Sequence, residues 1–445
     1  MADYIPKSLS MASASVQDFV RNRFSLEPQG SATAVANQQI SFVLPESALI
    51  DSKSLRLFMD VTTNSATEGS TTVYGRLPAD LASLVEKLEV YVQGTMVSDS
   101  SSEYNTVARI LKIAEGSRPR DESVDRCLSH GSIIEADAVE NETLVLQEWN
   151  GFLGENSARF LPTDILGSIV VKLTLAGNHV LVPKEASVSL GDNLTADGKV
   201  AATRLNYTVS NIRMTFDSII PPTAFVNVLK SRLASGEIRM NYKARYTYAL
   251  GGVGTAFTHR FGVSTGSLDR LFAVIRDGNN RTTGIKSYDL TDSSADGRGD
   301  SHVANAFRFR SYENLNNFRY RWEVNSVPMP SYDAKALEAI CDLHYGANKV
   351  GQHADGTLVS DQKWWRDGLA VVPLILNCPD EAGVAVRSGF STRGQNSQIV
   401  YRAFGMTTPT ADANTGETAE RESFIVAETT QQLCISAGRQ VVVNY

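Results

Sequence analysis

The sequence contains few of the residues that form metal sites or disulfide scaffolds. Its 445 residues include 4 cysteines and 6 histidines. Since no Cys-x-x-Cys pair occurs, we expect no disulfide framework or zinc site and regard each cysteine as a small buried residue, kept reduced where the chain is made. The absence of His-x-x-x-His and His-Glu-x-x-His spacing predicts surface or loop histidines rather than metal ligands. These residues are Cys127, Cys341, Cys378 and Cys434, and His130, His179, His259, His302, His344 and His353.

Long apolar runs are also missing. The longest, Gly368 to Cys378, is about half of the roughly 20 residues that a membrane-spanning helix requires. The segment Met1 to Ser15 is polar and is interrupted by Pro6, unlike a signal peptide. We therefore expect a soluble protein that is made in a cytosol.

The charge balance is mildly acidic, with 42 basic and 49 acidic residues and a net charge of −7. Binding of nucleic acid over a whole surface requires clustered Lys and Arg, so we expect no sequence-specific nucleic-acid binding, although one basic face remains compatible with this balance. A hydrophobic content of 42% and a charged content of 20% are typical of a folded protein, and the length allows two or three domains.

Catalytic and cofactor motifs are absent or incomplete. Gly389 to Arg393 places arginine where a Gly-x-Ser-x-Gly elbow requires glycine, and Gly251 to Gly254 predicts a turn rather than a dinucleotide loop. No Gly-Lys-Ser/Thr phosphate loop occurs, and the carboxylate pairs Asp121-Glu122 and Asp380-Glu381 fall in predicted loops. The sequence therefore predicts no catalytic, cofactor-binding or metal-binding residues, no cofactor and no enzymatic activity.

Three further motifs are weak. Trp364-Trp365 could form a sugar platform, but its charged flanks favour an anchor or a subunit contact. Arg298-Gly299-Asp300 matches an integrin-binding tripeptide by chance in our interpretation. Without a signal peptide, we expect the Asn-x-Ser/Thr sequons at Asn141, Asn193, Asn206 and Asn280 to be unmodified.

The main feature that is present is a duplicated β-rich plan. Ser54 to Val61 (Ser-Leu-Arg-Leu-Phe-Met-Asp-Val) is matched by Ser267 to Val274 (Ser-Leu-Asp-Arg-Leu-Phe-Ala-Val). A second strand and turn, Val90 to Val97, is matched by Trp322 to Met329. Repetition at this scale indicates two domains of one design rather than a solenoid.

A short helix follows the second strand in both copies. Tyr104 to Ala114 has apolar residues at helical spacing, and so does Ala334 to His344, for which Asp333 is the predicted N-cap. The apolar positions are Val107, Ile110, Leu111 and Ala114 in the first helix, and Leu337, Ile340, Cys341 and His344 in the second.

The strands between these landmarks are separated by polar loops, which is typical of a sandwich or barrel. Pro221-Pro222 makes a stiff connector, and Thr223 to Ala234 predicts a linker helix. Val16 to Phe24 predicts a short amphipathic helical turn in a locally basic arm, packed along a neighbouring domain or reaching another subunit or a membrane surface. The resulting domains are an N-terminal arm (1–37), a first barrel (38–220), a linker (221–236) and a second barrel (237–445).

With this order in place, the chain resembles the double jelly-roll major capsid proteins of tailless icosahedral double-stranded DNA viruses. The likeness is to the lineage of polinton-like viruses, virophages and nucleocytoplasmic large DNA viruses. It extends over Gln38 to Tyr445 and is most evident in Gly75 to Pro78, Ser83 to Gly94 and Asn316 to Pro330.

The resemblance implies an all-β fold with a few short helices, in which two eight-stranded jelly-roll barrels stand side by side. It implies homotrimeric, pseudo-hexameric capsomers that self-assemble inside the host cell and tile a virion shell around double-stranded DNA. The implied partners are the chain itself, neighbouring capsomers, penton and minor capsid or cement proteins and, in many members, an internal membrane. The loops 178–202 and 279–305 become tower or inter-subunit candidates, and the arm faces inward. The acidic balance and short arm give no support to direct contact with DNA.

Two other functions stay open. A secreted or surface β-sandwich that binds or processes glycans would need a signal peptide, or an aromatic groove with facing carboxylates. A spike or penton component would share the jelly roll but more often carries one barrel.

Overall fold

Alternation of buried and exposed side chains builds the strands, as a period of two requires. In β5 (Arg56–Thr63) Leu57, Met59 and Val61 point into a core, and the intervening side chains are partly exposed. The same alternation runs through β12 (Ile169–Leu175) and β18 (Arg319–Val324). These strands therefore each have one face on a core and one face outward.

The structure is a computed structural model of the chain. It describes residues 20–46, 48–76, 81–100, 103–114, 142–158, 160–185, 200–201, 203–220, 223–277, 317–336, 338–339, 341–342, 371–376, 389–393, 398–406, 421–436 and 440–444.

The first half of the chain forms three sheets. One has the order β10-β5-β14-β4-β11, with β1 and β2 also paired to β14; the others have the orders β3-β12-β8-β9 and β13-β7-β6. The strands are β1 (Val20–Leu26), β2 (Ala34–Val35), β3 (Gln39–Leu44), β4 (Leu49–Asp51), β5, β6 (Ser65–Glu68), β7 (Thr71–Arg76), β8 (Val85–Val92), β9 (Thr95–Ser100), β10 (Glu142–Leu146), β11 (Phe160–Pro162), β12, β13 (Val182–Glu185) and β14 (Tyr207–Ile220).

The second half forms two sheets, with the orders β15-β22-β17-β20, where β23 also pairs with β22, and β16-β21-β18-β19. The strands are β15 (Ile238–Gly251), β16 (Phe257–Gly262), β17 (Leu268–Asp277), β18, β19 (Val327–Lys335), β20 (Val372–Ile375), β21 (Gln398–Phe404), β22 (Arg421–Ile435) and β23 (Val441–Asn444). Among the described residues, the helices with defined bounds are α2 (Tyr104–Ala114), α4 (Thr163–Leu166) and α6 (Thr223–Ser235), with 3₁₀ turns η2 (Ser52–Ser54), η3 (Leu81–Leu84) and η4 (Asn178–Val180).

The two halves share one strand order, which confirms the duplicated plan. The sheet β3-β12-β8-β9 of the first half corresponds, strand for strand, to the sheet β16-β21-β18-β19 of the second. The strands β10-β5-β14-β1 correspond in the same way to β20-β17-β22-β15. Each half therefore contains the same two facing four-stranded layers, which is the eight-stranded jelly-roll arrangement that we expected.

The matching hairpins β8–β9 and β18–β19 use the same kind of turn. Gln93 and Gly94 have φ values of 49° and 80°, and Asn325 and Ser326 have φ values of 51° and 67°. Two consecutive residues with positive φ fit a two-residue type I′ turn, whose twist matches that of the flanking strands. The equal turn lengths place Thr95 and Val327 at equivalent positions.

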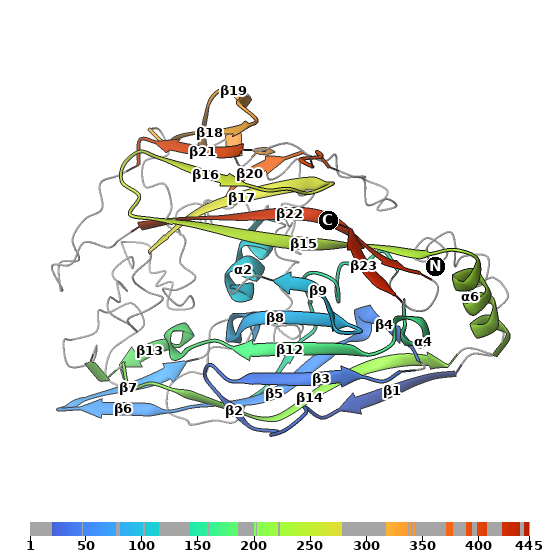
Figure 1. Cartoon of the computed structure of the whole chain (residues 1–445). Coiled ribbons are helices and arrows are strands. Elements are labelled where there is room, and N and C mark those ends of the chain that lie inside the picture. Colours follow the sequence, from blue (N-terminus) through green and yellow to red (C-terminus); the bar gives the residue numbers. More distant parts are fainter. Residues whose placement is uncertain are drawn as a thin grey trace, which may run out of the picture.

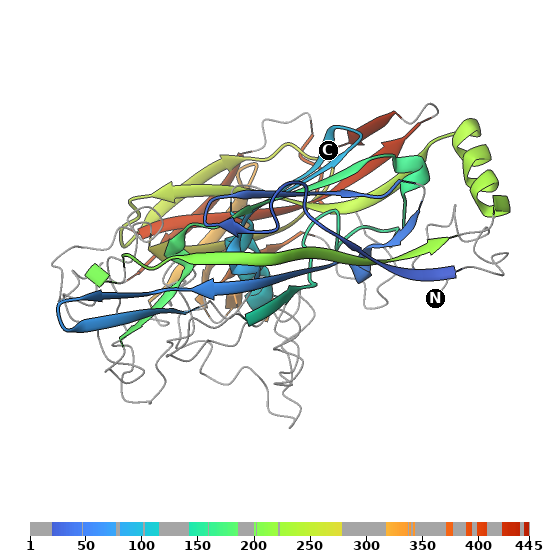
Figure 2. The same cartoon turned by 90° about the horizontal axis from the view of Figure 1, so that it is seen from below.

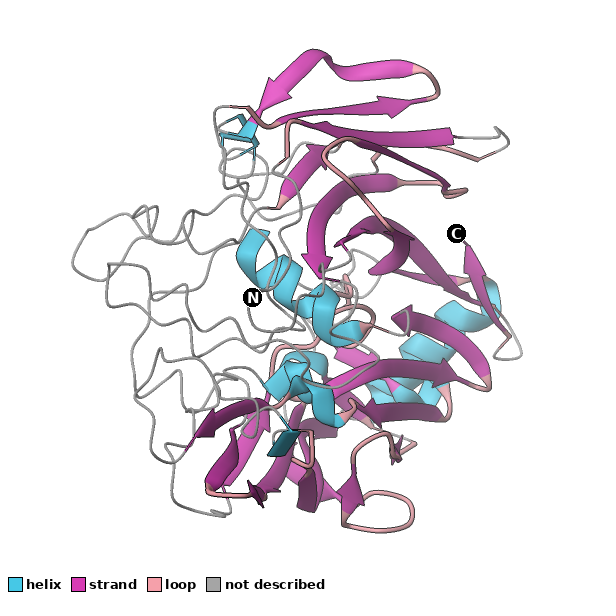
Figure 3. Ribbon diagram, turned by 90° about the vertical axis from the view of Figure 1, so that its left-hand side faces the viewer, coloured by secondary structure: helices cyan, strands magenta, loops and turns pink. Residues whose placement is uncertain are grey.

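Figure 1 shows the first barrel, in blue and green, below the second, in yellow to red, with α2 between them. Figure 2 shows α6, the predicted linker helix, at one end of the molecule, beyond the ends of β1 and β14. The side view in Figure 3 shows the two groups of strands stacked, with helices at their junction. The barrels therefore lie side by side in one body.

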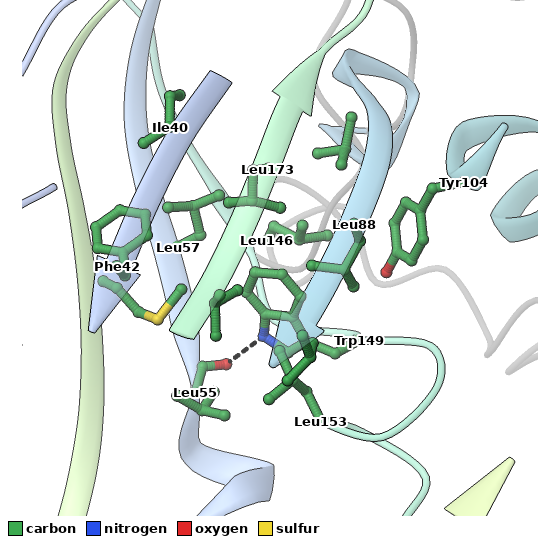
Figure 4. Close-up of a cluster of buried hydrophobic side chains, with 14 of the residues drawn as sticks. Ile40, Phe42, Leu55, Leu57, Leu88, Tyr104, Leu146, Trp149, Leu153 and Leu173 are labelled. Atoms are coloured by element: carbon green, nitrogen blue, oxygen red, sulfur yellow. Dashed lines mark hydrogen bonds between the residues drawn. The ribbon is translucent and has the colours of Figure 1, made fainter. Parts of the chain in front are cut away.

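Each barrel has its own core, and the first is drawn in Figure 4. There Phe42, Leu57, Leu88 and Leu173 come from both layers and meet side chains of the segment that follows β10. Trp149 from that segment is buried, and its indole Nε1–H donates a 3.0 Å hydrogen bond to the carbonyl oxygen of Leu55. Such a partner offsets the cost of removing the indole N–H from water.

Two local predictions were wrong. The segment predicted as a helical turn, Val16 to Phe24, has Val20 onwards in strand β1, because this stretch pairs along its length with β14. The second helix begins at Ala336 rather than Ala334, because the register with β18 extends β19 to Lys335. Asp333 accordingly lies in β19 and is not an N-cap.

The expected start of the first barrel at residue 38 does not coincide with the start of sheet pairing, because β1 and β2 already pair with β14. Two side chains of β1 also bind Asp217 in β14: Arg23 Nε donates at 2.8 Å to one carboxylate oxygen, and Arg21 donates to the other. The hydrogen bond from Arg23, together with Arg21, holds the pKa of Asp217 below its ordinary value.

We therefore expect Asp217→Asn to loosen β1 while leaving both barrels folded. Both arginines are largely exposed, so the loss in unfolding free energy should be only about 1 kcal/mol. Limited trypsin digestion read by mass spectrometry should show faster cleavage after Arg21 and Arg23. The control Glu68→Gln, which affects a 3.8 Å pair with Arg204, should leave this cleavage unchanged; equal rates in Asp217→Asn and the parent chain would refute the role of Asp217.

Candidate functional site

The structure separates the residues that the sequence singled out. His259 is buried in β16, contrary to the expectation of surface or loop histidines, and its Nδ1 lies 3.1 Å from the hydroxyl oxygen of Ser423. Burial lowers its pKa to about 4, so the ring is neutral near pH 7. Cys434 is buried as predicted, whereas Cys341 is exposed.

Most other singled-out residues lie outside the described part of the chain. Among them are the carboxylate pairs, Trp364-Trp365, Arg298-Gly299-Asp300, most of the candidate tower loops, and nine single cysteine, histidine and asparagine residues. They are Cys127, Cys378, His130, His302, His344, His353, Asn141, Asn193 and Asn280.

Within the described residues, Gly251-Gly252-Val253-Gly254 joins two strands, and no group of His, Cys, Asp or Glu is placed to hold a metal ion. Over the same residues, no helix is long and apolar enough to cross a membrane.

The charged side chains that do converge lie at the junction of the two barrels, which we call the seam. The seam comprises α2, β9 and residues 147–158 of the first barrel, facing β15, β17 and β22 of the second. Its apolar part is built by α2, whose predicted stripe packs against the outer face of β17 and β22. This cluster contains Val107, Ile110, Leu111 and Ala114 together with Phe272, Val274, Val371, Phe424 and Val426.

A buried arginine stands at the edge of this apolar cluster. Arg276 ends an otherwise apolar run in β17 and is 1% exposed. It donates to both carboxylate oxygens of Glu103, which immediately precedes α2, and its Nε lies 3.1 Å from Glu422. Its guanidinium also lies 4.2 Å from the ring centroid of Phe424. Burial opposes the charge, but Glu103 and Glu422 outweigh this cost and raise the pKa of Arg276, so it remains a cation.

A second buried group centres on Glu428 in β22, which is fully enclosed. Arg245 and Arg270 each donate to it at 2.8 Å, and Lys243 Nζ lies 3.8 Å away. Arg245 also donates to Glu155 of the first barrel, at 2.6 Å through Nη2. Burial would raise the pKa of Glu428, but the three cations together hold it well below its ordinary value.

Backbone contacts complete the seam. The backbone N–H of Ser157 donates at 2.8 Å to the carbonyl oxygen of Asn241, and the N–H of Asn241 donates at 3.0 Å to the Ser157 hydroxyl. The neighbouring hydroxyl of Tyr242 donates at 2.7 Å to the carbonyl oxygen of Val97 in β9, and its ring packs edge-on against Phe152. Strand β15 is thus bound along its first residues by the opposite barrel.

This geometry suits a structural role. Glu103 and Glu155 of the first barrel are paired with Arg276 and Arg245 of the second, so the carboxylates of the seam hold the two barrels together. The sequence reasoning missed this site, although one signal was available: Arg276 and Glu428 interrupt apolar strands, where a charge is stable only with a partner.

We expect Glu428→Gln to destabilise the protein by roughly 3–5 kcal/mol near neutral pH, because the buried Arg245 and the partly buried Arg270 and Lys243 lose their shared anion. Since the folded-state pKa of Glu428 is depressed, its contribution is complete above its unfolded-state pKa and is lost as the pH falls through the folded value. The difference between parent and variant should thus be constant above about pH 5 and shrink in more acidic solution. Urea midpoints across this range measure it.

The exposed Glu237, whose partner is Arg239, provides the matched control. Glu237→Gln should change the stability by less than about 0.5 kcal/mol. Equal effects of the two substitutions would contradict the role given to Glu428.

No protein-family model matches this chain, and no curated protein matches it. Solved structures do. A quasi-atomic model of the PBCV-1 virus capsid matches with a TM-score of 0.64 and 12% identity, covering 96% of this chain and 97% of that chain. The Faustovirus major capsid protein gives 0.52 and 9%, covering 97% and 94%, and the mavirus major capsid protein gives 0.52 and 10%, covering 97% and 93%. The chain therefore has the double jelly-roll fold of these viral capsid proteins.

Proposed function

We propose that this chain is a major capsid protein, located in the virion, that forms pseudo-hexameric homotrimers in the shell of an icosahedral double-stranded DNA virus. The observation that carries the proposal is that one chain holds two barrels of the same strand order in a fixed relation through a buried seam. The likeness to capsid structures over nearly the whole chain supports it.

Barrels of the same design can be arranged in a ring. Three copies supply six barrels, which approximate a hexagon and can tile a surface. Pairing strands into barrels leaves few open sheet edges, which limits uncontrolled aggregation at the high local concentration of a shell. In this proposal the chain acts as a structural protein rather than an enzyme.

The domain assignment belongs to the same proposal: an arm and two barrels joined by the linker that contains α6, with pairing that begins at β1. The loops 178–202 and 279–305 are proposed as tower or inter-subunit segments. Neighbouring capsomers, penton and minor capsid proteins, and an internal membrane are the proposed surroundings.

The glycan-binding alternative has less support. It requires aromatic side chains gathered along one groove. The exposed aromatic residues of the described part include Phe24 in β1 and Tyr332 in β19. These two strands lie on opposite sides of the molecule in Figure 1, so the two residues do not form one platform.

Native mass spectrometry of the recombinant chain tests the proposal. We expect a trimer near three times 48.4 kDa and, by negative-stain imaging, hexagonal outlines or patches of lattice. A chain that remains a monodisperse monomer at micromolar concentration would refute it.

A further inference from the structure

The two barrels can be compared residue by residue because their strand registers are known. Leu57 of β5 pairs with Met214 of β14. The β-bulge between Leu268 and Arg270 adds one residue to β17, so the counterpart of Leu57 is Leu271, which pairs with Ala427 of β22. Counting the same number of positions along β14 and β22, Ile220 corresponds to Leu433. Their cross-strand partners are Val20 in β1 and Met240 in β15. The pair Val20–Ile220 is thus the first-barrel counterpart of Met240–Leu433.

These equivalent pairs differ in burial. Met240 and Leu433 are 0% exposed, whereas Val20 and Ile220 are 56% and 51% exposed. Phe24 on the same strand is exposed as well, although its ring stacks on Phe216. Exposed apolar side chains that gather on one face are a feature of interaction surfaces, whereas isolated ones are common on any protein. We call Val20, Phe24 and Ile220 the β1 socket.

The cover of the second-barrel pair comes from the other barrel of the same chain. Met240 and Leu433 belong to the same buried cluster as Val97 of β9 and Phe152. Tyr242 stabilises the contact between β15 and β9, because its hydroxyl donates a hydrogen bond to the carbonyl oxygen of Val97. The element that closes the end of β15 is therefore the β8–β9 hairpin and the chain that follows β10.

The counterpart of this hairpin in the second barrel is β18–β19. In the described part of the chain β19 pairs with β18 alone, and Figure 1 shows it in the outermost layer of the molecule, on the side opposite β1. Its residues Val327 and Tyr332 are exposed, and Met329, the counterpart of Val97, is partly exposed. Among the described residues, the first barrel therefore has exposed apolar side chains at the end of β1 and β14. The second barrel has an exposed hairpin, β18–β19, whose strand β19 pairs with β18 alone.

We infer that the β1 socket of one copy receives the β18–β19 hairpin of a second copy, so that Val20, Phe24 and Ile220 contact Val327, Met329 and Tyr332. This inference rests on the proposed function and specifies the interface between copies. Each copy offers one socket and one hairpin, which makes the contact heterologous, and such a contact closes a ring when its rotation allows. The seam already relates the first barrel to the second within one chain. The same rotation, repeated between copies, places the six barrels of three chains one after another around the ring.

The composition of β19 fits this occupant. Pro328 and Pro330 deprive β19 of backbone donors, so the contact rests on side chains and does not extend a sheet from copy to copy.

The test uses two variants, one on each side of the contact. Ile220→Asp blocks the socket and Val327→Asp blocks the hairpin, and a charge buried in an apolar contact should weaken the association at least about 100-fold. By native mass spectrometry each variant alone should be monomeric where the parent chain is trimeric. Mixed in equal amounts they should form a 1:1 dimer, because each retains the half that the other lacks.

Val35→Asp provides the matched control, since Val35 is apolar and 45% exposed but pairs with Thr208 near the start of β14, whereas Ile220 ends that strand. From Thr208 to Ile220 the strand extends about 40 Å. This variant should remain trimeric. Circular dichroism and thermal melting verify folding, and Val20→Asp serves as a second socket variant if Ile220→Asp fails to fold.

The outcomes separate the two proposals. Trimers formed by both socket variants would overturn the β1 socket and leave the capsid proposal intact. Monomeric variants that do not dimerise on mixing would overturn the head-to-tail pairing. A parent chain that is itself monomeric would refute the proposed function.

Discussion

Burial of charge between the two barrels is the constraint on which the molecule depends. Moving a single ion from water into a protein interior costs several kcal/mol, and this cost is offset only when partners stand at hydrogen-bond distance. Glu428 has such partners in Arg245 and Arg270, and Arg245 extends the group to Glu155 of the first barrel. Arg276 likewise joins β17 to Glu103 before α2. Sliding one barrel over the other would break both sets at once, so the seam fixes their relation.

The duplication preserved topology while the outer faces diverged. By the register that equates Leu57 with Leu271, Asp60 corresponds to Val274 and Arg213 to Val426. The second barrel has apolar residues at these places because α2 covers them. In the first barrel Arg213 lies over the ring of Phe58, 5.2 Å from its centroid, a pairing that suits a surface in contact with water. Two barrels of one design thereby present different surfaces.

Much of the fold could be read from the sequence because its signals are local. Alternation in Leu55 to Val61, the two-residue turns after Val92 and Val324, and the apolar stripe of Tyr104 to Ala114 depend on neighbours a few positions apart. The linker helix, observed over Thr223–Ser235, also follows from local helix-forming residues preceded by Pro221 and Pro222. The repeat itself was visible because both copies kept these signals in the same order.

What the sequence could not determine depends on partners distant in the chain. Val20–Leu26 has mostly exposed side chains and no buried alternation, so it is a strand only because β14 offers it an edge and Asp217 binds its arginines. The sequence by itself therefore determined the duplicated β-rich plan, the hairpins and the helices after them. The tertiary structure decided which strand edges are covered, where α2 packs, and which charges meet in the seam, since hydrogen bonds and burial depend on proximity in space.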